Sequence, residues 1–592
     1  MKLEDLVLHT NPAVEAQFNQ TVEADITAFE AVAKEFTAGK LTPDAFRPHR
    51  LRRGVYTQRQ EGVHMIRTKI PGGILTADQM DCLAECSDEF AGGKGHLTTR
   101  QNMQYHFVPL PQVAPLLRKL AAGRLTTREA CYNTIRNITA SPLSGLRGDE
   151  VFDVQPYARQ TAFAFLHKEA YDSMPRKFKI AFYTGGAKDD MALAIHDVGC
   201  TAVIKDGKRG FRLVVGGGLG PMPVEARLLD EFLPTELLIP RIEAILRLFN
   251  KHGNRKNKNL ARLKFVLRDR GWDWVKETIE TEYAEILKGG GVAIPTAIPE
   301  NFAGFQTTAP PLGTGANLPI IGASSVDPEL DRWLETNVEE QRQPGYSIVT
   351  VRTQQGNLTA EQMRGMARIA RDAGDSYLRV SIMQNVYLAY VPVHNLRRVY
   401  SALRTLGLAE AGAHEITDTL TCPGAYSCNL ALTKSMNLGA ALTASTAKYK
   451  DAGVKQLSIH ISGCPNACGQ HWTADLGFFG NSRKINGREV PYYLMMLGGG
   501  IDKDGVMRFG AMVQSLPARL TTIAVDRVLE HFMKDRHAGE TFRDYVLRNK
   551  IGFFKELTAD LVKPLELSDE MCMDWGDDVA YSLQLGRGEC AS

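Results

Sequence analysis

Two stretches of the chain show the same order of hydrophobic and polar positions. In the first, His64–Ile70 (HMIRTKI) alternates as a strand does, Leu75–Phe90 has the apolar spacing of a helix, and Leu97–Leu110 alternates again. A strand, a turn, a helix and a second strand make up half of a ferredoxin-like sandwich. The pattern therefore predicts an α+β fold assembled from such halves.

The second stretch repeats the first. The hexapeptide LTADQM (Leu75–Met80) recurs as LTAEQM (Leu358–Met363), and an alignment without gaps also places Gln101 on Gln384. A match of this kind indicates a duplicated structural unit. We therefore expect two ferredoxin-like half repeats.

A more diverged repeat follows each copy. Lys177–Gly185 (KFKIAFYTG) aligns with Lys455–Gly463 (KQLSIHISG), and VVGGGLG from Val214 aligns with MLGGGID from Met496. The chain is therefore predicted to be an internally duplicated unit of two domain types, with the copies related by a pseudo-twofold axis.

Breaks in periodicity set the expected boundaries. The Pro- and Gly-rich stretch 307–319 interrupts every pattern and marks the junction of the halves. The expected parts are an N-terminal arm (1–60), a first ferredoxin-like repeat (61–125), a first larger half domain (126–305), a linker (306–340), a second ferredoxin-like repeat (341–412), a second larger half domain (413–560) and a C-terminal tail (561–592).

Composition and charge narrow the class of protein. With 592 residues and 44% hydrophobic composition, the chain can bury several cores. Lys plus Arg total 70 against 67 Asp plus Glu, so the net charge of +3 gives no general attraction to nucleic acid or to an anionic membrane. The sequence shows no signal-peptide pattern and no run near the roughly 18 apolar residues of a membrane span. We expect a soluble, cytoplasmic protein.

Four of the ten cysteines form two pairs. Cys422 and Cys428 have the spacing C-x5-C, and Cys464 and Cys468 have the spacing C-x3-C. Ten cysteines are too dilute for a disulfide scaffold, so the clustering indicates a metal site. Thiolates select zinc or iron-sulfur clusters, C-x5-C fits a zinc knuckle poorly, and Pro465 favours a turn-rich loop. A 4Fe-4S cluster is favoured, with structural zinc and buried thiols as alternatives.

Both pairs occur in the second copy. In the alignment above, Gly186 stands where Cys464 stands in the second copy, and Asn137 or a neighbour stands where Cys422 does. A duplicated fold in which one half kept or gained ligands predicts a site at the interface between the halves.

The motifs TCPGAYSC (421–428) and SGCPNACG (462–469) resemble those of the siroheme and 4Fe-4S sulfite and nitrite reductase family, most closely the sulfite reductase hemoproteins. The resemblance extends over nearly the whole chain, duplication included. It implies a siroheme beside a 4Fe-4S cluster. It also implies that Cys468 is both a cluster ligand and the axial thiolate of the siroheme iron, while Cys422, Cys428 and Cys464 hold the cluster only.

The same resemblance assigns a set of cations in the first half. Arg100 (TTRQN), Arg136 (NTIRN), and Lys177 and Lys179 (PRKFK) match the substrate-binding arginines and lysines of the family. Alternation along a strand would place the two lysines on one face. The second copy has Met383 where the first has Arg100. These cations would bind an oxyanion, polarise its breaking bond and supply protons.

Further residues carry weaker signals. Arg262 and Lys264 lie in the basic stretch 252–270, where the resemblance implies contacts with siroheme carboxylates and where a solvated basic helix is the alternative. His106 and His460 are expected to be hydrogen-bonded core residues rather than ligands.

The resemblance implies the six-electron reduction of sulfite to sulfide. Lys179 favours sulfite over nitrite, because assimilatory nitrite reductases of the family tend to carry Asn there and a dianion gains more from the extra charge. The chain has no nicotinamide or flavin fingerprint, so electrons would come from ferredoxin or a flavoprotein subunit. Reduction of nitrite to ammonia is the alternative within the family. An interaction or nucleic-acid-binding protein with a four-cysteine zinc site is the alternative of another class.

Overall fold

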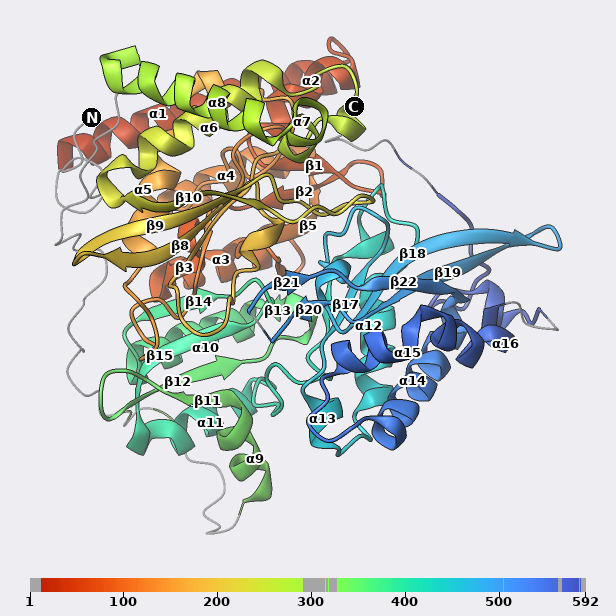
Figure 1. Ribbon diagram of the computed structural model, residues 1–592. Coiled ribbons are helices and arrows are strands. Elements are labelled where there is room, and N and C mark those ends of the chain that lie inside the picture. Colours follow the sequence, from red (N-terminus) through yellow and green to blue (C-terminus); the bar gives the residue numbers. More distant parts are fainter. Residues whose placement is uncertain are drawn as a thin grey trace.

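The computed structural model describes residues 12–290, 315, 318, 327–503, 505–562, 567–584 and 586 of the 592 (Figure 1). Most of the predicted linker 306–340, including nearly all of the stretch 307–319, lies outside these residues. In the described part, four five-stranded sheets account for the duplicated architecture.

Two of these sheets form the ferredoxin-like halves. The first contains, in spatial order, β1 (Val55–Thr57), β2 (Val63–Arg67), β5 (Met103–Pro109), β4 (Lys94–Leu97) and β13 (Asn357–Thr359). The second contains β11 (Val338–Glu340), β12 (Tyr346–Val351), β15 (Val386–Pro392), β14 (Tyr377–Val380) and β3 (Ile74–Thr76).

Each of these sheets is completed by a strand from the opposite half. Strand β13 pairs antiparallel with β4, and β3 pairs antiparallel with β14. The exchange is reciprocal, as a pseudo-twofold relation requires. The predicted duplicated α+β fold with two ferredoxin-like half repeats is confirmed.

The repeated hexapeptide starts a helix in each half. Helix α3 (Ala77–Phe90) follows Thr76, and α10 (Ala360–Ala373) follows Thr359. In both cases the threonine side chain and a glutamine three residues later form a reciprocal capping box, which satisfies backbone N–H groups of the first turn. The hexapeptide is thus explained by helix initiation at equivalent places.

The repeated glutamines fasten the domains together. Gln101 donates from Nε2 to the carbonyl oxygens of Ala140 and Val380, both at 2.8 Å. Gln384 donates from Nε2 to the Leu97 carbonyl oxygen at 2.8 Å and accepts at Oε1 from the N–H of Thr421, in the second larger half. Each glutamine therefore connects its own half repeat to the opposite one and to a larger half domain.

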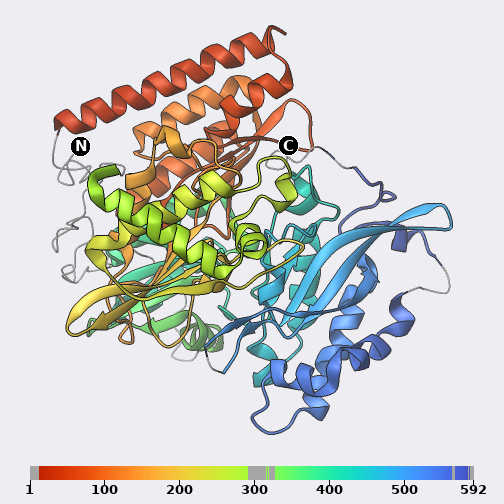
Figure 2. The same cartoon turned by 45° about the horizontal axis from the view of Figure 1, so that its top comes forward.

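The N-terminal segment folds onto the first half. Helix α1 (Pro12–Thr37) lies along α4 (Leu110–Ala122) and buries Ile26 and Phe29 (Figure 2). Strand β1 begins before residue 61, so the first sheet includes the end of the segment expected as an arm. Although α1 has 26 residues, neither it nor any other described helix is long and apolar enough to cross a membrane.

The two larger half domains also share one sheet topology. The first sheet contains β10 (Arg227–Pro234), β9 (Lys208–Val215), β8 (Val198–Lys205), β7 (Ile180–Tyr183) and β6 (Thr139–Ala140). The second contains β22 (Ala511–Pro517), β19 (Arg488–Leu497), β18 (Leu476–Ile485), β17 (Ile459–Ser462) and β16 (Leu420–Thr421). Their cores are closed by α5 (Gln155–Phe165), α6 (Leu238–His252), α7 (Leu263–Arg270) and α8 (Trp272–Glu285), and by α12 (Ser435–Thr446), α14 (Thr521–Asp535) and α15 (Phe542–Leu557) (Figure 1).

The strands correct the alignment of the second repeat by one residue. Ile180 pairs with Val198 and Ile459 pairs with Leu476, so Ile180 corresponds to Ile459 and not to Ser458. A shift of one residue would turn every side chain of the strand to the opposite face of the sheet. The register is therefore decided by which side chains must be buried.

The same correction changes the counterparts of the cysteines. Cys464 corresponds to Gly185, not to Gly186, and Cys422 corresponds to Ser141. The expected counterpart of Cys422, Asn137 or a neighbour, was therefore misplaced. The strand pairing, unlike the sequence alignment, is not disturbed by the insertions between the two copies.

Candidate active site

Parallel strands bring the two cysteine pairs together. Cys422 directly follows β16, Cys464 comes two residues after β17, and these strands are parallel neighbours. Because the carboxyl ends of parallel strands meet at one edge of a sheet, both pairs belong to loops at the same edge.

The loop that carries the second pair is a series of turns, as predicted. Ala467 has φ of 56°, in the left-handed region. At Gly469 a Cβ atom would lie 2.0 Å from the carbonyl oxygen of Ile461, so close backbone approach requires glycine. The Gly463 N–H donates a 3.3 Å hydrogen bond to Sγ of Cys422, a contact that tunes a metal-bound thiolate.

The four thiols lie within electrostatic range of one another. Burial raises the pKa of Cys422, Cys428 and Cys464, to about 12 for Cys428, and Cys468 is the second cause in all three. Cys468 itself is exposed. Within the described part of the chain, no three His, Cys, Asp or Glu side chains converge on a point that could hold a single metal ion. Four grouped thiols fit a 4Fe-4S cluster, which four Cys thiolates hold.

Cys468 lies where the two halves of the molecule meet. Its carbonyl oxygen accepts a 3.0 Å hydrogen bond from Oγ1 of Thr99, in the first half. Burial lowers the pKa of Lys179 well below its usual range, Lys177 lowers it further, and the Cys468 thiol acts in the opposite direction. The cysteine predicted to be shared therefore lies near cations from the first half.

Arg100 is buried and anchored in that half. Its Nη1 lies 2.6 Å from Nε2 of His196, and its Nη2 donates to the carbonyl oxygens of Asn137 and Ile180. Nδ1 of His196 lies 3.0 Å from the carbonyl oxygen of Ala192, so Nδ1 carries the proton and Nε2 accepts from Arg100. The arginine charge is thereby held in one place.

The other predicted cations join the same group. Lys177 and Lys179 flank Phe178, which is fully buried, so alternation places both lysines on the opposite face from the core. Arg136 donates to two backbone carbonyl oxygens and to the hydroxyl of Tyr56 at 3.1 Å. Its charge acts on Arg100, which in turn acts on Lys179, so the four cations lie in one electrostatic group.

Arg67, at the end of β2, belongs to this group although it was missing from the predicted set. Burial lowers its pKa, with Arg136 the next cause, and the Cys468 thiol acts in the opposite direction. Its Nε donates to Oδ1 of Asn102 at 3.2 Å. The internal repeat contains a sequence signal for Arg67, because the second copy has the uncharged Thr350 at the equivalent strand position.

Arg262 and Lys264 are held by protein groups. Arg262 forms a buried ion pair with Asp197, at 2.8 Å from Nη2 to Oδ2 and 3.3 Å from Nε to Oδ1. Asp197 also accepts the N–H of Lys179 at 2.8 Å. Lys264 donates to three carbonyl oxygens of the loop 218–222. Arg262, through Asp197, therefore fixes the segment that contains Lys179, and Lys264 fixes the loop 218–222. Their contact with siroheme carboxylates stays a prediction.

Several buried polar atoms of the first half have no partner among the described residues. They are Nε of Arg100, Oε1 of Gln104 and both ring nitrogens of His106. Gln104 and His106 share one face of β5, while Tyr105 between them is buried in the core. Each such atom costs about 1–3 kcal/mol unless a bound group satisfies it. Nε of Arg100 and a protonated ring nitrogen of His106 are donors and fit a ligand rich in carboxylates, as siroheme is, whereas Oε1 of Gln104 requires a donor. The expectation of a hydrogen-bonded His106 was wrong.

Known protein families match three segments of the chain. The nitrite and sulphite reductase 4Fe-4S domain matches residues 131–287. The nitrite/sulfite reductase ferredoxin-like half domain matches twice, at residues 56–123 and 339–406. The double match coincides with the two sheets that exchange strands.

Curated relatives extend the similarity to most of the chain. The assimilatory ferredoxin-dependent nitrite reductase of Haloferax mediterranei is 30% identical over 520 residues, 83% of this chain and 83% of the relative. The chain belongs to the nitrite and sulfite reductase family. A sulfite reductase [ferredoxin] of Mycobacterium tuberculosis is 27% identical over 84% of this chain and 87% of its own. The solved structure of the Mycobacterium tuberculosis NirA protein matches with a TM-score of 0.73 and 25% identity, over 87% of this chain and 92% of that one.

Members of this reductase family use siroheme and a 4Fe-4S cluster, the two predicted cofactors. The four grouped thiols fit the cluster, and the cations around Cys468 fit the carboxylates of siroheme. This assignment replaces the alternative of a redox-inert protein with a structural zinc site.

Proposed function

We propose that this reductase converts sulfite to sulfide with six electrons from an external donor protein. The observation that carries the proposal is Lys179, which lies within electrostatic range of both Lys177 and Cys468. When bound, siroheme coupled to a 4Fe-4S cluster supplies single electrons to the anion. Binding, orientation and protonation fall to the side chains of the chain.

The cations of the first half hold the anion. Arg67, Arg136 and the two lysines place positive charge where a buried oxyanion would otherwise be unpaired. Burial and neighbouring charges lower the pKa of Lys179, so its ammonium gives up a proton more readily than an ordinary lysine. We assign Lys179 to proton donation toward the departing oxygen.

We assign Cys422, Cys428 and Cys464 to the cluster alone, and Cys468 to the cluster and the siroheme iron. The support is the exposure of Cys468 and its position against the first half, whereas Cys464 is buried. A thiolate at this interface is the one that two adjacent groups can share.

Nitrite is the second candidate substrate, because relatives named nitrite reductase and sulfite reductase match this chain at similar identity. Lys179 supports sulfite, since a dianion gains more from a second ammonium group than a monoanion does.

The test compares kcat/KM for the two anions in holoprotein reduced by a viologen dye. We expect a higher value for sulfite. Lys179→Asn should lower the sulfite-to-nitrite ratio about tenfold, because a charge-assisted hydrogen bond contributes about 1.5–3 kcal/mol. Lys205→Asn, at an exposed lysine of β8, is the control. A higher value for nitrite in the parent protein would overturn sulfite, and an unchanged ratio would remove Lys179 as the discriminator.

The names of the relatives include ferredoxin, which supports ferredoxin as the donor over a flavoprotein subunit. Ten cysteines in 592 residues are too dilute for a disulfide scaffold and suit a reducing compartment, so we place the reaction in the cytoplasm. Turnover with reduced ferredoxin, compared with turnover with a flavoprotein reductase, tests the donor.

A further inference from the structure

The second strand of each ferredoxin-like half, β2 or β12, is followed by a buried cation at the same position. Arg67 of β2 pairs with Gln104, and Thr350 of β12 pairs with Tyr387. Two residues after these equivalent positions stand Lys69 in the first half and Arg352 in the second. Both cations are buried, at 3% and 8% exposure.

In the first half, Lys69 holds the loop that leads to Arg136. Its Nζ lies 3.2 Å from Oε2 of Glu129, and it donates to the carbonyl oxygen of Ile135 at 3.3 Å. The Lys69 N–H also donates to the carbonyl oxygen of Thr126 at 2.7 Å. The loop is therefore fastened at three places, the last one directly before Arg136.

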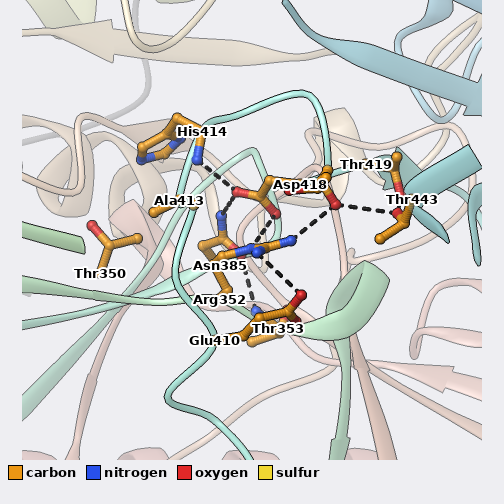
Figure 3. A network of polar contacts seen from close by, with 12 residues as sticks. Thr350, Arg352, Thr353, Asn385, Glu410, Ala413, His414, Asp418, Thr419 and Thr443 are labelled. Atoms are coloured by element: carbon orange, nitrogen blue, oxygen red, sulfur yellow. Dashed lines mark hydrogen bonds and ion pairs between the residues drawn. The ribbon is translucent and has the colours of Figure 1, made fainter. Parts of the chain in front are cut away.

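In the second half, Arg352 holds the loop that leads to Cys422 (Figure 3). Its Nη2 donates to the carbonyl oxygen of Thr417 at 2.9 Å, and Nη1 donates to that of Ala411. Its Nε lies 3.7 Å from Oδ1 of Asp418, whose side chain is 6% exposed. The planar guanidinium thus binds the start and the end of one loop at once.

Asp418 passes this constraint to the cysteine. Its Oδ2 accepts from Nδ2 of Asn385 at 2.7 Å and from the N–H of His414 at 2.9 Å (Figure 3). Gln384, the neighbour of Asn385, accepts the N–H of Thr421 at 3.1 Å. Thr421 directly precedes Cys422, so the path from Arg352 ends at the first thiol.

We propose that these are two copies of one brace, by which we mean a buried cation and its carboxylate partner that fix a loop, and that each copy positions a different site residue. The Lys69–Glu129 brace positions Arg136 against the anion, and the Arg352–Asp418 brace positions Cys422 against the cluster. All four are positioning residues. The inference rests on the proposed function for the roles of Arg136 and Cys422.

Matched variants separate the effect of one brace on anion binding from the effect of the other on the cluster. Lys69→Gln should raise the KM for sulfite about tenfold, as the loss of a charge-assisted contact would, and leave the EPR spectrum of the reduced cluster unchanged. Arg352→Gln should change that spectrum or lower the bound iron and acid-labile sulfide, with the KM of the loaded fraction unchanged. A general loss of stability would move both readouts in both variants, which would overturn the proposal.

Hydrogen exchange of the holoprotein provides a readout that does not depend on turnover. Faster exchange across residues 411–421 is expected in Arg352→Gln, and faster exchange across 126–136 in Lys69→Gln. Should either variant fail to fold, Arg352→Lys and Lys69→Arg keep the charge and change the geometry of the donors. Equal protection of both loops in every variant would contradict the brace. Parent protein without a cluster or without activity on sulfite would instead refute the proposed function.

Discussion

The hydroxyl of Thr99 donates a 3.0 Å hydrogen bond to the carbonyl oxygen of Cys468. Thr99 directly precedes Arg100 in the first half, and Cys468 is the exposed thiol of the second. One hydrogen bond therefore joins the first half directly to the cysteine that we assign to both metal centres.

Replacing this hydroxyl should disturb Cys468 without emptying the site. Thr99→Val keeps the shape of the side chain and removes one neutral hydrogen bond, which contributes about 1 kcal/mol. We expect a shifted visible spectrum of the holoprotein and a changed EPR signal, with iron content unchanged. Thr99→Ser, which keeps the hydroxyl, is the control. Identical spectra for Thr99→Val and the parent would show that the contact does not position Cys468.

Arg67 gives a second prediction. Its guanidinium lies within electrostatic range of the Arg136 charge and the Cys468 thiol, and a lysine there would keep the charge and lose the fork of donors. We expect Arg67→Lys to raise the KM for sulfite about tenfold, in line with one lost charge-assisted hydrogen bond.

The matched control is Arg118→Lys in α4, where a half-buried arginine at the surface pairs with Glu23 and Glu30. Exposed ion pairs contribute little, so steady-state kinetics should not distinguish this variant from the parent. A KM for Arg67→Lys as low as that of the control would exclude Arg67 from the anion site.

Much of the architecture was predictable because it is local. The spacing of apolar residues and the Thr76 cap determine α3, and the same signals determine α10. The reciprocal exchange of β3 and β13 was not predictable, because pairing between distant strands leaves no period in the sequence. The one-residue slip at Ser458 has the same origin, since alignment of diverged repeats does not sense which face is buried.

The candidate site was predictable where the spacing of residues in the sequence indicates the chemistry. It was less predictable where the burial of a side chain decides its role. The cysteine pairs stood out by their intervals, and parallel strands explain why they meet. The sequence predicted Arg100 at the site and not Arg67, but the structure places both arginines near Arg136. Arg262 was expected either to contact siroheme carboxylates or to lie on a solvated basic helix, and its burial beside Asp197 provides a partner that no local pattern shows.

Asp190 supplies a pH dependence of stability. Burial raises its pKa from 3.8 to about 7, although Ser141 donates a hydrogen bond to it. The folded state therefore favours the protonated carboxyl, and this stabilisation is complete below the unfolded pKa and is lost as pH rises through about 7. At roughly 1.4 kcal/mol per pKa unit, the change amounts to about 4 kcal/mol.

Asp190→Asn is neutral at every pH and should flatten this dependence. The measurement is the Tm of the variant relative to the parent, at equal cofactor loading, which should rise between pH 5 and pH 8. Asp206→Asn, in an exposed turn, should track the parent at both values. A relative Tm of Asp190→Asn that does not change with pH would mean that the carboxyl is charged throughout.

The C-terminal tail lies along the chain segment that follows Cys428. Figure 1 shows the tail leaving the second larger half and running toward the first. Five hydrogen bonds join it to residues 429–437, and one further bond from that segment leads back toward the cysteines. The five are Tyr581 Oη to Leu432 O (2.8 Å), Lys434 N to Asp574 Oδ2 (2.7 Å), Lys434 Nζ to Asp577 Oδ1, Asn437 Nδ2 to Trp575 O (2.7 Å) and Gly586 N to Asn429 O (2.9 Å).

These contacts predict that the tail retains the cluster. The N–H of Leu432 donates to the carbonyl oxygen of Gly463 at 2.7 Å, next to Cys464, so loosening the tail loosens both cysteine loops. Tyr581→Phe removes one hydrogen bond of about 1 kcal/mol, and the rate of cluster loss in air should rise about fivefold. Bleaching of the visible absorbance measures that rate. Truncation after Gly586 keeps every one of these contacts and should bleach as the parent does. Equal rates for Tyr581→Phe and the parent would show that the tail covers the loop without securing it.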